Sequence, residues 1–64
     1  MRHYRFDIGE TVLFTERRAE VSWKAEYIVV AHVPADELEL RYYIRSTNRH
    51  YDRVARDHEL SASS

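Results

Sequence analysis

The chain has 64 residues, no cysteine, and a formal net charge of −1 from 11 acidic and 10 basic side chains. This length holds one small domain without room for a deep substrate pocket. Without cysteine there is no disulfide framework, no thiolate nucleophile and no cysteine-ligated zinc site. The longest apolar run, residues 27–31, is far shorter than the roughly 20 residues that a membrane-spanning helix needs. We expect no membrane association.

The start of the chain is polar and lacks the apolar segment of a signal peptide. We therefore expect a cytoplasmic protein of bacterial type. Residues 1–60 are predicted to form one domain and residues 61–64 a disordered polar tail. Five arginines against one acid make residues 41–56 a basic segment within an otherwise acidic chain.

The first predicted strand covers residues 11–15, where Val12 and Phe14 share one face after the flexible Gly9. Residues 15–24 are polar and do not alternate. They are predicted to form a long loop, or a loop with one helical turn around residues 16–20.

The second predicted strand, Tyr27–Val33, is rich in β-branched and aromatic residues and ends at Pro34. Its apolar residues occur at both parities, as in a strand that is covered on both faces or bent at a barrel corner. A turn at residues 34–37 then leads into a third strand, Leu38–Ser46. In that strand Leu38, Leu40, Tyr42 and Ile44 share a face opposite Glu39, Arg41, Tyr43 and Arg45.

The last segment is ambiguous, since Tyr51, Val54, Ala55 and His58 also match helical spacing. After a tight turn at residues 46–48 we favour a strand over residues 51–55, because it would cover an otherwise open sheet edge. A 3₁₀ turn over residues 56–59 would then return Leu60 to the core. The predicted class is all-β: a small SH3-like barrel of four to five short antiparallel strands with a C-terminal 3₁₀ turn.

Several segments carry a resemblance: Ile8–Val12, Tyr27–Val30 with Pro34, Leu40–Ser46 and Tyr51–Leu60. In these the chain resembles a group of small uncharacterised bacterial proteins that we associate with KOW- or Tudor-type SH3-like barrels. The resemblance covers most of the chain and implies the fold. It implies no particular activity, because SH3-like barrels serve many unrelated functions.

One candidate site is a sheet face rich in arginine and tyrosine. If Tyr42 and Ile44 point inward in one strand and Val54 in the next, five side chains point outward together: Arg41, Tyr43, Arg45, Tyr51 and Arg53. Such a face suits single-stranded RNA or DNA, because aromatic rings stack on bases and arginines contact phosphates. Against this, the chain is not strongly basic, with an isoelectric point near 6.4. The face could equally be a solvated sheet surface of favourable cross-strand pairs.

A second candidate is a peptide groove formed by Trp23 and Tyr27 with Tyr42 or Tyr43, of the kind that binds proline-rich or methylated segments. The alternative is that Trp23 and Tyr27 only complete a small core. Self-association is a third possibility, because a small barrel leaves strand edges exposed.

No spacing of the four histidines suggests a metal site, and we expect no metal or cofactor. No phosphate-binding glycine loop and no nucleophile with a base are evident, so an enzyme is not expected. The sequence thus predicts a non-catalytic binding module whose partner is another protein or a second copy. Single-stranded nucleic acid is the alternative ligand.

Overall fold

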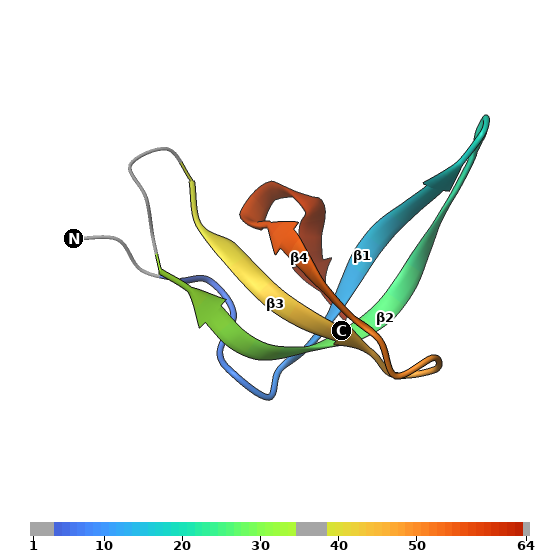
Figure 1. The fold of residues 1–64 in the computed structure, drawn as a ribbon. Helices are drawn as coiled ribbons and strands as arrows, with labels where there is room; N and C mark the ends of the chain where they lie inside the picture. Colours follow the sequence, from blue (N-terminus) through green and yellow to red (C-terminus); the bar gives the residue numbers. More distant parts are fainter. Residues whose placement is uncertain (1–3, 35–38, 64) are drawn as a thin grey trace.

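The computed structural model describes residues 4–34 and 39–63, which form an all-β domain (Figure 1). Its elements are five strands and one short 3₁₀ helix: β1 Thr11–Arg18, β2 Val21–Val33, β3 Arg41–Ser46, β4 Asp52–Arg56, η1 Asp57–Glu59 and β5 Leu60–Ala62. All strand pairs are antiparallel. The predicted all-β class, with its short antiparallel strands and C-terminal 3₁₀ turn, is confirmed.

The five strands form one strongly bent sheet in the order β4-β3-β2-β1-β5 (Figure 1). The long strand β2 joins the two halves: its first part pairs with β1, and its second part pairs with β3. The pairing with β3 shifts register between Val29 and Ala31, and a bulge of this kind bends a strand and increases its twist. The bulge changes the parity that faces the core: Tyr27 and Val29 are buried before it, and His32 lies opposite the buried Tyr42 after it.

The core lies on the concave side of this sheet and is made from every strand. Its buried residues are Phe6, Val12, Phe14, Tyr27, Val29, Tyr42, Ile44, Ala55 and Leu60. The alternation predicted for β3 is confirmed, since Tyr42 and Ile44 are fully buried whereas Tyr43 and Arg45 are exposed. Leu60 returns to the core as predicted, 4% exposed.

The prediction of a long loop or helical turn over residues 15–24 is wrong. β1 and β2 continue as a hairpin that projects away from the core, with Arg18 opposite Val21 (Figure 1). The turn uses Ala19 at a φ of 54°. Polar residues fill both faces because this hairpin extends past the core, so that burial no longer imposes an apolar alternation.

The turn between β3 and β4 exchanges the predicted inward and outward faces of β4. Ser46 pairs with Tyr51 through its backbone N–H, which leaves a four-residue loop in which His50 has a φ of 58°. Ala55 then lies opposite Tyr42 and is buried, whereas Val54 is 47% exposed. The prediction that Val54 points inward is therefore wrong, because loop length sets register and a shift of one residue exchanges the faces.

Two boundaries also differ from the prediction. β3 begins at Arg41, and Leu38 and most of the predicted turn at residues 34–37 lie outside the described residues. At the other end, Ser61 and Ala62 belong to β5 and pair with β1 instead of starting a disordered tail. The free edge of β1 beside the core explains this pairing, since backbone hydrogen bonds can order polar residues that the sequence pattern marks as a tail.

Candidate functional site

The predicted arginine and tyrosine face is divided between the two sides of the sheet. Arg41, Tyr43 and Arg45 point outward from β3, as predicted. Arg53 lies on the core side, and its guanidinium carbon is 4.2 Å from the centre of the Phe14 ring. Tyr51 also turns to that side, where its hydroxyl is 2.8 Å from that of Tyr27. The five residues therefore do not form one face.

The outward half of the predicted face is partly neutralised. Arg45 donates from Nε to one oxygen of Asp52 at 2.7 Å and from its terminal nitrogen to the other at 3.2 Å. Hydrogen bonding to Arg45 holds the pKa of Asp52 below its usual value. Tyr43 is 42% exposed and lies opposite the apolar Val54. This surface is thus part apolar and part ion-paired.

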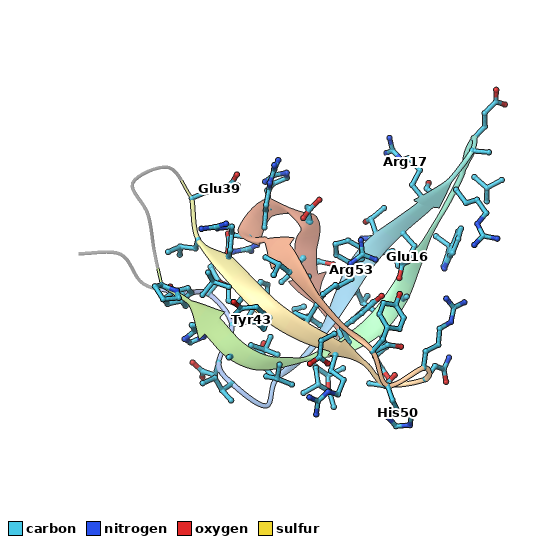
Figure 2. All side chains as sticks on the ribbon, viewed as in Figure 1. Glu16, Arg17, Glu39, Tyr43, His50 and Arg53 are labelled. Carbon is cyan, nitrogen blue, oxygen red and sulfur yellow. The ribbon has the colours of Figure 1, made fainter. Side chains whose placement is uncertain are left out.

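The inward half forms a polar cluster with a residue that the sequence reasoning missed, Glu16 of β1. The Tyr27 hydroxyl donates to Glu16 Oε2, and an Arg53 terminal nitrogen donates to Glu16 Oε1 at 3.0 Å. Tyr51 lies 3.5 Å from Glu16 Oε2, at the limit of a hydrogen bond. Figure 2 shows Glu16 and Arg53 near each other between the hairpin and β4, with Tyr43 away from them on β3. We call Glu16, Tyr27, Tyr51 and Arg53 the carboxylate cluster.

The electrostatics of the carboxylate cluster favour a neutral phenol beside a charged ion pair. Burial, and then the hydrogen bond to Glu16, raise the pKa of Tyr27 above its usual value. The pKa of Arg53 is also raised: burial opposes the charge, but the neighbouring Tyr27 and Glu16 outweigh it. The Glu16 side chain is only 16% exposed, so its bonds are screened less by water than those of a surface pair. The cluster therefore joins β1 and β2 to β4 through hydrogen bonds.

Two hollows flank this cluster, and Glu16 contributes to both. The smaller, of about 250 Å³, lies between the hairpin and the β3–β4 turn; it is lined by Glu16, Trp23, Lys24, Ala25, Glu26, Tyr27, Ser46, Asn48, Arg49 and Tyr51. The larger, of about 570 Å³, is more open and lies between β1, Arg53 and η1. The wall of the smaller hollow contains the accessible rings of Trp23 and Tyr51, and we call it the Trp23 hollow.

The structure divides the predicted Trp23 and Tyr27 groove into an exposed and a buried part. Trp23 is 42% exposed, whereas Tyr27 is 1% exposed and stacks edge-on against Phe14. Tyr51, 36% exposed, supplies the second accessible ring, and neither Tyr42 nor Tyr43 lines this hollow. Glu16 was missed because its segment was interpreted as a loop. Continuing the alternation of Val12 and Phe14 would have placed it on the inner face, opposite Trp23.

Two of the described histidines, His32 and His58, make side-chain contacts. His32 stacks on Tyr4 with ring centres 3.9 Å apart, and its Nε2 is 2.7 Å from the Phe6 carbonyl oxygen. His58 Nδ1 is 3.1 Å from a carboxylate oxygen of Glu39. Within residues 4–34 and 39–63 there is no group of three or more His, Asp or Glu side chains that could hold a metal ion.

Comparison with protein-family models, with curated proteins and with solved structures finds no match to this chain. In the part of the chain that the structure describes, no helix is long and apolar enough to cross a membrane. The geometry of the site is therefore the basis for the functional proposal.

Proposed function

We propose that this domain is a non-catalytic protein-interaction module that binds an extended peptide segment in the Trp23 hollow. One observation carries the proposal: two accessible aromatic rings, Trp23 from β2 and Tyr51 from the residue before β4, line the same hollow. Proline rings and other apolar side chains of an extended segment pack well against such rings.

The Tyr51 ring is held by hydrogen bonds before a ligand arrives. The Tyr51 hydroxyl is bonded to that of Tyr27, which is itself bonded to Glu16. Trp23 lies directly opposite Glu16 in the hairpin ladder. Because the Tyr51 hydroxyl is already bonded, ordering this ring on binding costs less conformational entropy than it would for an unbonded ring.

The charge of the hollow also suits a peptide. Its wall contains two carboxylates, Glu16 and Glu26, and two cations, Lys24 and Arg49, so that the formal charges cancel. Asn48 adds an amide that can both donate and accept hydrogen bonds. A balanced polar rim around aromatic rings matches the uncharged backbone of a peptide better than a polyanion.

Single-stranded nucleic acid is the less supported ligand. Its predicted face would have combined three arginines with two tyrosines, but Tyr51 and Arg53 contribute to the carboxylate cluster on the other side of the sheet. Arg45 is bonded to Asp52. Fewer charges are thus available to phosphates on any one face.

We also propose that the domain is an SH3-like barrel of a bacterial cytoplasm. The strongly bent five-stranded sheet supports an SH3-like barrel, and the lack of cysteine is compatible with a reducing bacterial cytoplasm.

The test is selection of binders from a display library of random twelve-residue peptides, followed by titration of a selected synthetic peptide. Trp23 is the only tryptophan, so its fluorescence reports directly on the hollow. Binding should weaken at least about tenfold in Trp23→Ala and in Tyr51→Ala, the usual effect of removing a central aromatic contact. For Trp23→Ala, calorimetry replaces fluorescence.

Tyr43→Ala is the matched control, since Tyr43 has the same 42% exposure as Trp23 but lies on the opposite face. It should bind the selected peptide as the wild type does. Failure to select any peptide, or equal binding by Trp23→Ala and Tyr43→Ala, would contradict the proposed function.

A further inference from the structure

One edge of β2 has no neighbouring strand where the hairpin projects away from the core (Figure 1). β3 pairs with β2 only from Tyr27 onward, so that among the described residues no strand lies beside residues 21–25 on that side. Residues 21–24 are all exposed. Strand edges of this kind can accept another extended chain. We call residues 21–25 on this side the β2 edge.

Two sets of backbone hydrogen bonds show how the groups of β2 are directed. Val29 is bonded on the side of β1: its N–H donates to the Glu10 carbonyl at 3.0 Å, and its carbonyl accepts from the N–H of Gly9 at 2.7 Å. The carbonyl of Glu26 points to the opposite side, where it accepts from the N–H of Thr47 at 3.3 Å. Odd-numbered residues before the bulge therefore face β1, and even-numbered residues face the side of β3.

The same alternation continues into the hairpin. In an antiparallel strand the direction of the backbone groups changes from each residue to the next. The register between β1 and β2 has no shift between residues 21 and 28, so nothing interrupts this order. The N–H and carbonyl groups of Ser22 and Lys24 therefore point to the β2 edge, where no strand of the described residues pairs with them.

The Trp23 hollow lies at this same edge. Trp23, Ala25 and Tyr27 line it from one face of β2, and Lys24 and Glu26 line it from the other. Since neighbouring residues of a strand point to opposite faces, a hollow that contacts both sets includes the strand edge between them. A ligand in the Trp23 hollow is therefore beside the unpaired backbone groups of β2.

We propose that the bound peptide adds to the β2 edge as an antiparallel strand, an inference that rests on the proposed function. The peptide residue opposite Trp23 is apolar and directs its side chain into the hollow that Trp23 and Tyr51 line. The residue before it lies opposite Lys24, and the residue after it lies opposite Ser22. Each of these two residues exchanges two backbone hydrogen bonds with β2, four in total.

Charge complementarity specifies the peptide residue opposite Lys24. The Glu16 carboxylate of the hollow is already paired with Arg53 at 3.0 Å. Neither Lys24 nor Arg49 has an ion-pair partner among the described residues, which leaves two cations against Glu26 alone. An aspartate or glutamate opposite Lys24 is the complementary side chain, because opposite charges on paired strands attract.

The proposal thus gives the peptide a short signature, an acidic residue followed directly by an apolar one. Proline is accepted at the apolar position, since a residue opposite Trp23 has its N–H directed away from β2. Proline is excluded at the positions before and after it, where the N–H donates to β2.

The first test changes single backbone groups of a peptide selected on the wild-type domain. Replacing the N–H by an N-methyl group at the residue before or after the apolar one should weaken binding about tenfold, because a hydrogen bond to the edge is lost. N-methylation of the apolar residue itself is the matched control and should leave binding within about twofold. Trp23 fluorescence measures all three, and an equal effect at the three positions would overturn the proposal.

The second test changes the β2 edge. Ser22→Pro removes an N–H that points to the edge and takes no bond from the ladder with β1, whereas Ser22→Ala keeps this N–H. Ser22→Pro should bind the peptide about tenfold more weakly than Ser22→Ala. Circular dichroism checks that both variants are folded, and equal binding by two folded variants would overturn the proposal.

The third test exchanges charges between the domain and the peptide. Lys24→Glu should weaken binding about threefold to tenfold, because two acids then lie opposite each other. A peptide in which lysine replaces the acidic residue should recover this loss with Lys24→Glu and bind weakly to the wild type. Absence of recovery would overturn the proposed register.

These outcomes separate the strand addition from the proposed function. If Trp23→Ala loses the peptide but N-methylation has the same effect at all three positions, the peptide binds through its side chains alone. That result would overturn the strand addition and leave the peptide-binding function intact. Failure to select any peptide would overturn both.

Discussion

Two clusters of the domain use the same chemistry at opposite ends of the core. In the carboxylate cluster, Glu16 binds the Tyr27 hydroxyl with one oxygen and Arg53 with the other, and Arg53 stacks over Phe14. At the other end, which we call the Asp57 cluster, Asp57 accepts from the Tyr42 hydroxyl at 2.7 Å on one oxygen and from Arg5 at 2.8 Å on the other. Arg5 likewise lies over a phenylalanine ring, Phe6, at 4.7 Å.

The clusters differ in what surrounds them. Around Asp57, the arginine also donates to the carbonyls of Asp57 and Leu60, and so joins the N-terminal segment to η1 and β5. Around Glu16, a second tyrosine, Tyr51, reaches the cluster from outside and forms a wall of the Trp23 hollow. The comparison indicates that the same motif closes the core at one end and supports an accessible surface at the other.

The largest loss of stability is expected from removing the ring of Tyr42, which is buried in the core and bonded to Asp57. Tyr42→Ala deletes a fully buried aromatic side chain, which costs about 3–5 kcal/mol. A domain of this size has a total stability of about the same magnitude. The variant should be unfolded at 25 °C by circular dichroism, and a cooperative thermal transition like that of the wild type would contradict the assignment of Tyr42 to the core.

The two carboxylates allow a direct comparison of the clusters. Glu16→Ala and Asp57→Ala should each lower the free energy of unfolding by about 1–3 kcal/mol, since a buried phenol and an arginine lose their partner. Glu16→Ala should have the larger effect, because the Glu16 side chain is less exposed, 16% against 25%, and two tyrosines reach it. Urea unfolding measures both values, and a smaller loss for Glu16→Ala would reverse the ranking.

The tyrosines predict loss of stability at alkaline pH. Burial, and then the hydrogen bond to Asp57, raise the pKa of Tyr42 to about 12 from 10.0. The folded state favours the protonated phenol of Tyr42. The contribution of this phenol to the free energy of unfolding is therefore complete below pH 10 and is lost as the pH rises toward 12. This loss amounts to about 2–3 kcal/mol. Tyr42→Phe should lose less stability over this pH range than the wild type, and an identical pH profile would show that Tyr42 is not responsible.

The smallest effect on stability is expected from Trp23→Ala, although this change is proposed to weaken peptide binding strongly. Trp23 is 42% exposed on a hairpin that extends past the core, so Trp23→Ala should change the free energy of unfolding by no more than about 0.5 kcal/mol. A loss above about 1.5 kcal/mol by urea unfolding would identify Trp23 as a structural residue instead.

Much of the fold was predictable from local alternation, and the site was less so. The patterns around Val12, Tyr42 and Ile44 identified core strands, because burial imposes a period of two on each of them. The hairpin at residues 15–24 was not predictable in this way, since both of its faces contact water. The inward position of Arg53 depended on the length of one turn, and register of that kind is fixed by backbone geometry that composition does not reveal.

The most direct test of the account is a nuclear magnetic resonance titration of the ¹⁵N-labelled domain with a peptide selected on it. The account predicts that amide signals shift in the Trp23 hollow, at Trp23, Asn48, Arg49 and Tyr51, with the Tyr43 and Val54 signals unchanged. Shifts centred on Tyr43 and Val54, with the signals of the hollow unmoved, would contradict it.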